Sequence, residues 1–436
     1  MAGPGLPVNI DTTYADSGTD PSVKIHQQNH DTGHTYLDKF DSTILTGVNG
    51  QTLAYNVGGL IVPVNASSAS PAGETLVVGT GSAAIQAAVT AAPAGGVVRI
   101  PAGTSHTMVS AVVFPNKDIT VLAYGAIINN TQTAGTYAFT KGTNRNRLTW
   151  LGGSFIGTGS GINYTLPTSV YQSYDFVFRD VSFNFPSTET ALYLGGLREG
   201  VIESCFFDNC TGIRLAETLN THVTGCQFRT CTHGIYAGST GSPFDAGLMV
   251  NNCTIIGCSY GVRVVGWEAT HILNSMIDYN DHSVNLTNVN GVALIANYFS
   301  QRDYAGTASP AVYIGTNGAT FGNNAQHIRF LANNVVTHST ASPQLATCLQ
   351  LDGVTWCSVA DNSLQYFSQY GINLTTTANT YVKITDNDFV NIAGGTTPAS
   401  IKGSGSGYDD TWRISGNYLS IPTVGVLYAT VFQNLP

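Results

Sequence analysis

The sequence predicts an all-β protein: a right-handed, single-stranded parallel β-helix (a solenoid) with a small helix-containing region before it. Three observations favour this fold class. The chain has 436 residues, of which only 10% are charged, and it carries 48 glycines and 21 tyrosines, a composition that favours β-structure with many turns over coiled coil or disorder. A short segment recurs from Cys205 to Asn417, and each recurrence is accompanied by a second short strand with alternating apolar and polar residues.

The recurring segment begins with cysteine or asparagine and continues with apolar residues. Nine copies begin at Cys205, Cys226, Cys253, Asn274, Asn297, Asn333, Asn362, Asn387 and Asn417. Their mean step of about 26 residues lies in the range of solenoids and propellers. A propeller needs four strands per blade, whereas two to three strands fit each step here, and no helix follows each strand as in leucine-rich repeats. The repeat therefore favours a parallel β-helix of about a dozen coils, with like residues stacked about 4.8 Å apart.

The second strand of each repeat has apolar residues on either side of one polar or aromatic residue. The middle residues are Tyr193, Arg214, Tyr236, Arg263, Asn285, Tyr313, Gln350 and Asn373. Alternation points them outward, where aromatic faces and Arg or Asn donors suit sugar rings. We expect substrate binding by Arg214, Tyr236, Arg263, Trp267, Asn285 and Tyr313, with Trp267 in a neighbouring turn. The alternative is a solvated face on which Tyr and Arg only cover apolar surface.

Three cysteine pairs repeat with the same spacing. Cys205, Cys226 and Cys253 are each followed by a second cysteine five residues later. This spacing predicts stacked, buried and reduced thiols; disulfides and a metal site are the alternatives, but zinc sites have tighter spacing. Reduced thiols fit a protein that folds in the cytoplasm.

Two regions are predicted ahead of and within the repeat. Residues 81–436 form the β-helix domain, and a short helix at 82–92, ended by Pro93 and two glycines, covers its open end. Residues 1–80 do not follow the repeat: 52–73 reads as short strands and a linker, and 21–40 can be helical. His26, His30 and His34 would share one face of that helix, as a metal site or as a polar seam.

Charge and hydropathy exclude two classes of partner. A net charge of −9 gives no electrostatic basis for binding nucleic acid. The first twenty residues lack the features of a signal peptide, and no apolar stretch is long enough to span a membrane. We therefore expect neither nucleic-acid binding nor membrane insertion.

Two motifs resemble known proteins. Residues 24–56 (including Ile25-His26-Gln27-Gln28 and Lys39-Phe40-Asp41-Ser42) resemble the attachment region of minor tail proteins and tail fibres of long-tailed bacteriophages. Ala84-Ile85-Gln86-Ala87-Ala88, with Gly95-Gly96 and Ile100-Pro101-Ala102-Gly103-Thr104, resembles the entry to the pectate-lyase-like β-helix of phage tailspikes. The resemblance implies a homotrimer in the virion tail, with residues 1–80 docking on other tail proteins.

The acidic residues offer weaker candidates for catalysis. Glycoside hydrolysis needs two carboxyl groups about 5 to 9.5 Å apart. The first candidates are Glu268, Asp278 and Asp281, with Asp245 in the preceding long turn, and then Glu217, Asp303 and Asp352. Asp386 and Asp388 are a weak calcium signal, and neither a cofactor nor a metal is predicted.

Two functional classes follow from these observations. The first is a tail fibre or tailspike that attaches the virion to a host surface glycan without chemistry. The second is a tailspike that also cleaves the polysaccharide, as a glycoside hydrolase or lyase. A free β-helix enzyme, such as a lyase or epimerase, is disfavoured by the attachment-like N-terminal region.

Overall fold

The computed structural model describes residues 45–46, 52–57, 60–63, 73–141, 146–165, 173–238, 245–302, 309–316, 325–337, 347–367, 369–375, 379–390, 399–403 and 412–419. The chain forms two compact units, 1–76 and 77–436. The predicted helix at 21–40, with its three histidines, and Asp303 lie outside the described residues. In the first unit, β1 (Leu45–Thr46), β2 (Thr52–Val57) and β3 (Leu60–Pro63) form an antiparallel sheet, and β4 (Glu74–Leu76) follows.

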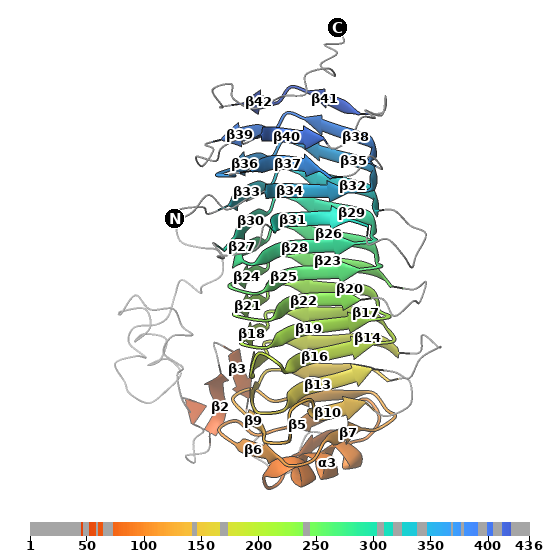
Figure 1. Ribbon diagram of the computed structural model, residues 1–436. Helices are drawn as coiled ribbons and strands as arrows, with labels where there is room; N and C mark the ends of the chain where they lie inside the picture. The colour runs from red at the N-terminus through yellow and green to blue at the C-terminus, as the bar shows by residue number, and fades with distance from the viewer. Residues whose placement is uncertain are drawn as a thin grey trace, which may run out of the picture. The chain divides into compact units, whose positions relative to one another are not determined.

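The second unit is a right-handed parallel β-helix, as predicted (Figure 1). Each coil contributes one strand to each of three parallel sheets, so that strand i pairs with strand i+3 of the next coil. The chain runs from sheet 1 to sheet 2 to sheet 3 and then enters the next coil.

Sheet 1 contains the strands that open each coil. In the second unit these are β5 (Gly96–Arg99), β8 (Ile119–Leu122), β11 (Leu148–Leu151), β14 (Ser173–Arg179), β17 (Leu197–Glu203), β20 (Leu219–Thr224), β23 (Ala246–Asn251), β26 (Glu268–Leu273), β29 (Asn290–Ile295), β32 (Ala325–Leu331), β35 (Val354–Ala360), β38 (Thr380–Thr385) and β41 (Arg413–Ser415).

Sheet 2 follows after a tight corner. Its strands are β6 (Ser105–Met108), β9 (Ile127–Asn130), β12 (Ser154–Gly157), β15 (Ser182–Asn184), β18 (Phe206–Asp208), β21 (Gln227–Arg229), β24 (Thr254–Ile256), β27 (Met276–Asn280), β30 (Tyr298–Gln301), β33 (Asn334–Thr337), β36 (Ser363–Gln365), β39 (Asp388–Val390) and β42 (Tyr418–Leu419).

Sheet 3 carries the strands that the alternating pattern predicts. They are β7 (Val112–Phe114), β10 (Tyr137–Lys141), β13 (Ser160–Thr165), β16 (Thr190–Gly195), β19 (Thr211–Ala216), β22 (His233–Gly238), β25 (Tyr260–Val265), β28 (His282–Thr287), β31 (Pro310–Gly315), β34 (Thr347–Asp352), β37 (Tyr370–Leu374) and β40 (Ala399–Gly403).

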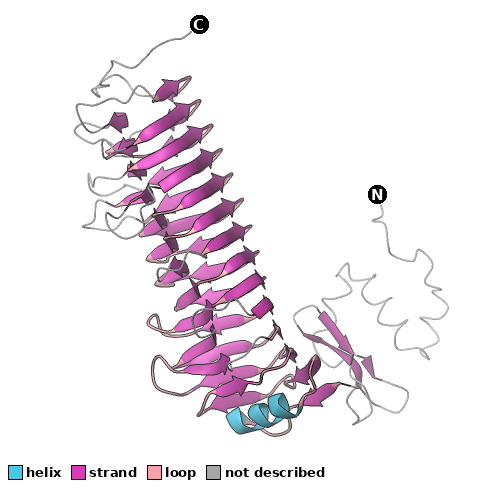
Figure 2. Cartoon of the chain, turned by 90° about the vertical axis from the view of Figure 1, so that its right-hand side faces the viewer, coloured by secondary structure: helices cyan, strands magenta, loops and turns pink. Residues whose placement is uncertain are grey.

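One helix, α3 (Gly81–Ala91), packs at the start of the coils against β6 and β7, as Figure 2 shows. It buries Ile85, Ala88 and Val89, and its alanine-rich sequence suits a helix. The helix ends before Pro93, which confirms the predicted cap over the N-terminal end of the core.

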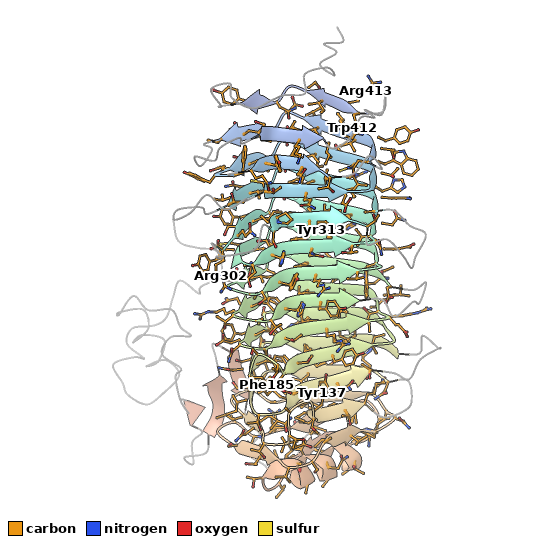
Figure 3. All side chains as sticks on the ribbon, in the orientation of Figure 1. Tyr137, Phe185, Arg302, Tyr313, Trp412 and Arg413 are labelled. Atoms are coloured by element: carbon orange, nitrogen blue, oxygen red, sulfur yellow. The ribbon has the colours of Figure 1, made fainter. Side chains whose placement is uncertain are left out.

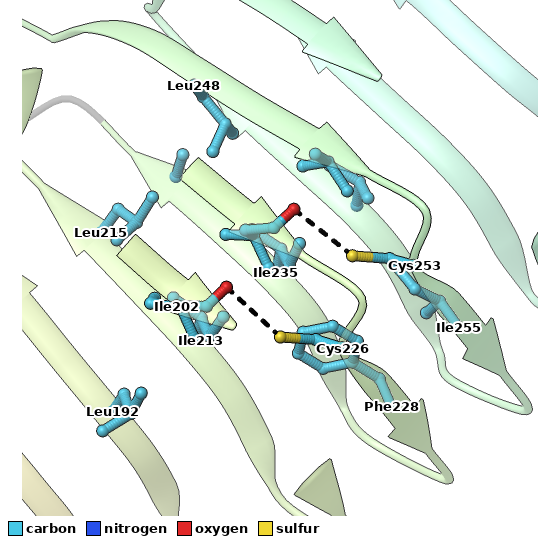
Figure 4. Close-up of a cluster of buried hydrophobic side chains, with 14 of the residues drawn as sticks. Leu192, Ile202, Ile213, Leu215, Cys226, Phe228, Ile235, Leu248, Cys253 and Ile255 are labelled. Carbon is cyan, nitrogen blue, oxygen red and sulfur yellow. Dashed lines mark hydrogen bonds between the residues drawn. The ribbon is translucent and has the colours of Figure 1, made fainter. Parts of the chain in front are cut away.

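The interior consists of stacked like residues. Phe155, Phe183, Phe207 and Phe228 come from four successive coils, and their ring centroids are 4.9, 5.1 and 4.7 Å apart. All eight cysteines are buried and unpaired, which confirms the predicted interior thiols. Figure 4 shows Cys226 and Cys253 among the aliphatic side chains, each with its thiol directed at a carbonyl of the preceding coil.

The corner between sheets 1 and 2 is short and repeats along the stack of coils, which we call the shaft. It has a residue with positive φ, such as Ser204 or Asn252, followed by the Cys or Asn of the recurring segment. One predicted register is wrong here. Met276 pairs with Thr254, so Ser275, and not Asn274, stands in line with Cys253. Asn274 instead takes the positive-φ position, with φ of 49°, which Asn tolerates better than most residues.

Candidate functional site

The outer face of sheet 3 carries one continuous ladder of polar and aromatic side chains. Strand pairing aligns each predicted residue with the next, and we call this set the outer ladder: Tyr193, Arg214, Tyr236, Arg263, Asn285, Tyr313, Gln350 and Asn373. Asn163 precedes it and Lys402 follows it in register. Figure 3 shows the labelled Tyr313 on β31, in the middle of this face.

Arginine and tyrosine contact each other along the outer ladder. The guanidinium carbon of Arg214 lies 4.7 Å from the ring centroid of Tyr193, and that of Arg263 lies 5.6 Å from Tyr236. Such cation–π contacts hold both side chains in place while leaving the guanidinium donors available. The ladder is therefore an ordered surface rather than a set of loose side chains.

Two tyrosines lie along their strands because glycine follows them. A Cβ atom added at Gly238 would lie 2.6 Å from the hydroxyl of Tyr236, and one at Gly315 would lie 2.5 Å from that of Tyr313. Each ring therefore leans over the glycine two residues later. This arrangement gives the outer ladder flat, half-buried rings at Tyr236 and Tyr313.

A second group of three rings lies beside the outer ladder, and we call it the edge stack. His233, Tyr260 and His282 come from successive coils, with centroid distances of 5.1 and 4.5 Å and nearly parallel planes. Arg263 also lies 5.0 Å from the Tyr260 ring. The edge stack thus widens the aromatic surface beside the part of the outer ladder that β22, β25 and β28 carry.

The histidines of the edge stack are held neutral. Burial, and then the positive charges of Arg263 and Arg214, lower the pKa of His233 to about 4. Burial also lowers the pKa of His282, against the opposing charge of Asp281 and with support from Arg263. At neutral pH the cations in this part of the face are therefore arginines.

Sequence reasoning missed the edge stack because strict alternation fails in sheet 3. Gly234 and Ile235 are both buried, and the residues on either side of them, His233 and Tyr236, both lie on the outer face. A Cβ at Gly234 would lie 2.6 Å from the Gly261 carbonyl oxygen, so only a residue without a side chain allows this step. The glycine directly before the inward-facing aliphatic residue was the available signal.

Tyr313 is the point where the outer ladder meets a carboxylate. Its hydroxyl donates to Asp352 Oδ2 over 3.4 Å. Burial, the negative charge of Asp352 and this hydrogen bond raise the pKa of Tyr313 to about 12. Tyr313 is therefore a hydrogen-bond donor, and not a base, at any ordinary pH.

Trp267 does not belong to this face, and its predicted contact with substrate is wrong. The side chain is 1% exposed and lies in the hydrophobic core, at the corner between β25 and β26. At this corner the apolar ring packs inward, into the core of the β-helix. We remove Trp267 from the site.

The predicted acidic cluster is divided between sheets. Glu268 is exposed at the start of β26 in sheet 1, whereas Asp278 lies on β27 in sheet 2. The six residues of β26 alone separate Glu268 from the next corner by about 17 Å, which exceeds the range of a hydrolytic pair. Asp245 does lie next to Glu268 in the adjacent coil, where Glu268 N–H donates to its carbonyl over 2.8 Å, but Asp245 is buried.

The remaining acidic candidates are also not arranged as a pair of carboxyl groups. Ser300 Oγ donates to Asp278, and Arg302 Nη2 lies 2.6 Å from Asp281 Oδ1 at the edge of sheet 3 (Figure 3). Glu217 occupies a corner with φ of 54°. Asp386 and Asp388 have no third ligand, since no group of three metal-binding side chains occurs in the described residues. Within the described ranges, the predicted carboxylates do not lie together on one face.

One perturbed group that the sequence did not indicate lies off this face. Burial lowers the pKa of Lys141 to about 7, against the opposing charge of Asp118. Its Nζ donates to Tyr164 Oη over 3.0 Å and to Asn146 Oδ1 over 2.9 Å. A lysine with this pKa can exchange protons at neutral pH, but these contacts fix it within the first coils.

Comparison with known proteins agrees with the fold. Residues 124–299 match the family described as right handed beta helix region. No curated protein sequence matches the chain. Across the described ranges, no helix has the length and apolar character needed to cross a membrane.

The solved structures that are similar to this chain include the following three. The Streptococcus pneumoniae surface protein and adhesin PfbA is 15% identical, with a TM-score of 0.56 over 75% of this chain and 98% of that chain. DFA-IIIase from Arthrobacter chlorophenolicus A6, in complex with GF2, is 15% identical, with a TM-score of 0.51 over 81% and 99%. Tailspike protein 3 of bacteriophage CBA120 is 11% identical, with a TM-score of 0.45 over 79% and 59%.

These likenesses establish a shared architecture and no more. The two structures with a TM-score above 0.5 are each 15% identical to this chain, and they are an adhesin and DFA-IIIase, so the fold does not by itself indicate the function. The tailspike fit is too loose to carry an argument. What is shown is the fold class, a right-handed parallel β-helix, and the resemblance to phage tail proteins in particular stays a prediction.

Proposed function

We propose that this protein is a polysaccharide-binding protein that holds an extended glycan along the outer face of sheet 3. The observation that carries the proposal is the outer ladder, in which tyrosine and arginine alternate in register over four successive coils from Tyr193 to Arg263. Like the shaft, a glycan chain is a linear repeat. A ladder with one contact residue per coil therefore suits a ligand that runs parallel to the shaft.

The chemistry of the face suits sugars. Rings such as Tyr236 and Tyr313 give flat apolar surfaces, and Arg214 and Arg263 give several donors each for hydroxyl or carboxylate oxygens. The neutral edge stack adds aromatic area without adding charge. Apolar rings with a few well-placed polar groups are the usual composition of a ligand site.

Binding without cleavage is the form of the proposal that the geometry favours. Cleavage needs two carboxyl groups at a defined separation, and the predicted acids lie on different sheets or are engaged by Ser300 and Arg302. Asp352 contacts the outer ladder, but it accepts a hydrogen bond from Tyr313. No partner carboxylate for it lies in the outer ladder.

We further propose that the glycan lies on a bacterial surface and that the chain is a trimeric component of a phage tail. Support comes from the sequence motifs at residues 24–56 and 84–104 that resemble tail proteins. In this proposal residues 1–80 dock on other tail proteins and the β-helix contacts the host. Light scattering of the full-length protein is the direct measurement of the trimer, and a stable monomer of 45.9 kDa would contradict it.

The decisive experiment measures binding to an array of bacterial capsular and lipopolysaccharide glycans. We expect the triple variant Arg214→Ala, Tyr236→Ala, Arg263→Ala to bind its best glycan at least tenfold more weakly, because each lost ring or donor contact contributes about 0.5–1.5 kcal/mol. A matched control is Arg229→Ala, Tyr279→Ala, which removes an exposed arginine and an exposed tyrosine from sheet 2.

Two outcomes would overturn the proposal. Equal binding by the triple variant and the wild type would place recognition elsewhere. New reducing ends, or an unsaturated sugar product, after incubation of the wild type with the bound glycan would show a depolymerase instead of a binding protein.

A further inference from the structure

A column of left-handed backbone positions runs through sheet 1, on a different side of each coil from the outer ladder. Its earlier members, with φ of about 50 to 73°, are Glu199, Asn220, Gly247, Ala269 and Gly291. Small or polar residues are expected there, since a positive φ is unfavourable for bulky side chains. The strand register continues the column through His327 and Trp356 to Tyr381.

The last three members all carry rings, and the two bulky ones, Trp356 and Tyr381, break this rule. His327, Trp356 and Tyr381 have φ of 54, 53 and 52°, and Trp356 and Tyr381 are 48% and 53% exposed. Their rings stack, with centroid distances of 4.7 and 5.9 Å and interplanar angles of 19 and 23°. Large rings at strained and exposed positions in three successive coils are not explained by core packing, and strain of this kind is typical of functional sites.

A column of cations runs beside these rings. Strand pairing aligns Arg329, Ser358, Lys383 and Arg413 in successive coils, and the three charged side chains are exposed. Among the described residues, no carboxylate lies within ion-pair distance of any of the three. Figure 3 labels Arg413 at the C-terminal end of this face. In a chain of net charge −9, three exposed cations in one column form a local positive field.

The stacked geometry indicates the sign of the charge on the ligand. Because the rings cover one another's faces, solvent meets mainly their edges, and ring edges carry the positive part of the aromatic quadrupole. Edges and cations both attract anions. Neighbouring coils are about 4.8 Å apart, so Arg329 and Lys383 are separated by about 10 Å along the shaft, a spacing suited to a linear ligand with repeated charges.

We propose that this aromatic–basic strip, formed by His327, Trp356, Tyr381, Arg329, Lys383 and Arg413, is a second binding site that takes a linear acidic polysaccharide. It is separate from the outer ladder on sheet 3 and does not depend on the function proposed there. The acid groups lie against the cations, and the sugar backbone lies across the ring edges.

The test uses the full-length protein and hyaluronate, a polymer with one carboxylate per disaccharide, with carboxyl-reduced hyaluronate as the neutral match. We expect the wild type to bind the acidic polymer, to bind the reduced polymer at least tenfold more weakly, and to lose affinity as salt is raised. The variant Arg329→Ala, Trp356→Ala, Lys383→Ala should lose at least tenfold in affinity for hyaluronate.

Two control variants distinguish the aromatic–basic strip from the rest of the surface. Arg229→Ala, Tyr279→Ala removes one cation and one ring of similar exposure, since Tyr279 is 49% exposed and also has a positive φ of 53°. This variant should bind hyaluronate as the wild type does. The sheet 3 triple variant should also keep its hyaluronate affinity, so failure of the glycan site and failure of this strip are distinguishable.

Three results would overturn the proposal. They are equal affinity for hyaluronate and its reduced form, equal affinity of the strip variant and the wild type, and a change of oligomeric state in the strip variant. The last result, measured by light scattering, would assign the strip to contact between copies of the chain.

Discussion

The corner between sheets 1 and 2 is built with cysteine in the earlier coils and with asparagine in the later ones. Cys226 Sγ donates to the Ile202 carbonyl over 3.5 Å, and Asn362 Nδ2 donates to the Phe330 carbonyl over 2.9 Å. Both acceptors are inward-facing residues of the preceding sheet 1 strand. Thiol and amide thus meet the same requirement, which is a donor for one buried carbonyl.

The difference is that asparagine also serves the neighbouring coil. Asn333 N–H and Asn333 Nδ2 both donate to Asn362 Oδ1, over 2.8 and 3.0 Å, and the pattern continues from Asn362 to Asn387 and from Asn387 to Asn417. The asparagine coils are therefore linked to each other by side-chain bonds. The cysteine coils depend on packing and on weak S–H donors, and the transition is made by Ser275, which accepts from Cys253 N–H over 3.1 Å.

The largest expected effect is at the middle of the asparagine ladder. Asn362→Ala leaves the Asn333 N–H without its partner in the core and removes the Nδ2 donor from the Phe330 carbonyl, so we expect a loss of about 3 kcal/mol in the free energy of unfolding. Urea denaturation followed by circular dichroism is the measurement. Asn274→Gly is the control, because Asn274 lies at the positive-φ position, and its effect should be within about 0.5 kcal/mol; equal losses in both variants would contradict the register.

A smaller effect is expected in the cysteine coils. Cys226→Ala removes a weak donor and a small volume, so we expect a loss of about 1 kcal/mol. The thiols should also resist labelling in the native state. Hydrogen bonding with Cys231 and burial hold the pKa of the Cys210 thiol well above its usual value, and burial raises the pKa of Cys357 to about 12. Rapid labelling of all eight thiols without denaturant would show that these coils are open.

The smallest effect is acid sensitivity, which we expect in the coils with the edge stack and not in the asparagine coils. The folded pKa of His233 is about 4, below the ordinary value of about 6.5. Between these values the unfolded chain binds more protons than the folded one, so stability is lost as pH falls from 6.5 towards 4. Hydrogen exchange at pH 7 and pH 5 should show β22, β25 and β28 weakening while the asparagine coils do not change. His233→Gln should reduce this difference, and a uniform response along the shaft would contradict it.

The sequence was sufficient for the fold and for the outer ladder because both depend on period and pitch. Stacking repeats every coil, so Tyr193 and Arg214 could be aligned without knowing any contact. The errors arose where a strand does not alternate strictly between inward and outward side chains, or at a corner between two sheets. Gly234 shifts His233 to the outside, a corner directs Trp267 inward, and Asn274 matched the pattern by residue type although Ser275 holds the position.

The acidic candidates could not be judged from sequence for a related reason. Glu268 and Asp278 are ten residues apart, but that interval contains a whole sheet 1 strand and a corner. The two residues are therefore close in the sequence but lie on different faces of the β-helix. The aromatic–basic strip was missed because nothing in the local sequence marks His327, Trp356 and Tyr381 as positions with positive φ.

The fixed corner between sheets 1 and 2 makes the coil a unit that can be removed whole. Cys205 and Cys226 occupy the same position in neighbouring coils, so excision of residues 205–225 would join Ser204 to Cys226 and recreate the same corner. The shaft would shorten by about 4.8 Å, and Tyr193 would come to lie next to Tyr236. Each coil carries one residue of the outer ladder, so gain or loss of a coil adds or deletes one contact in the middle of the recognition surface. A lineage of such proteins can therefore revise what it recognises by changing its number of coils, without redesigning its core.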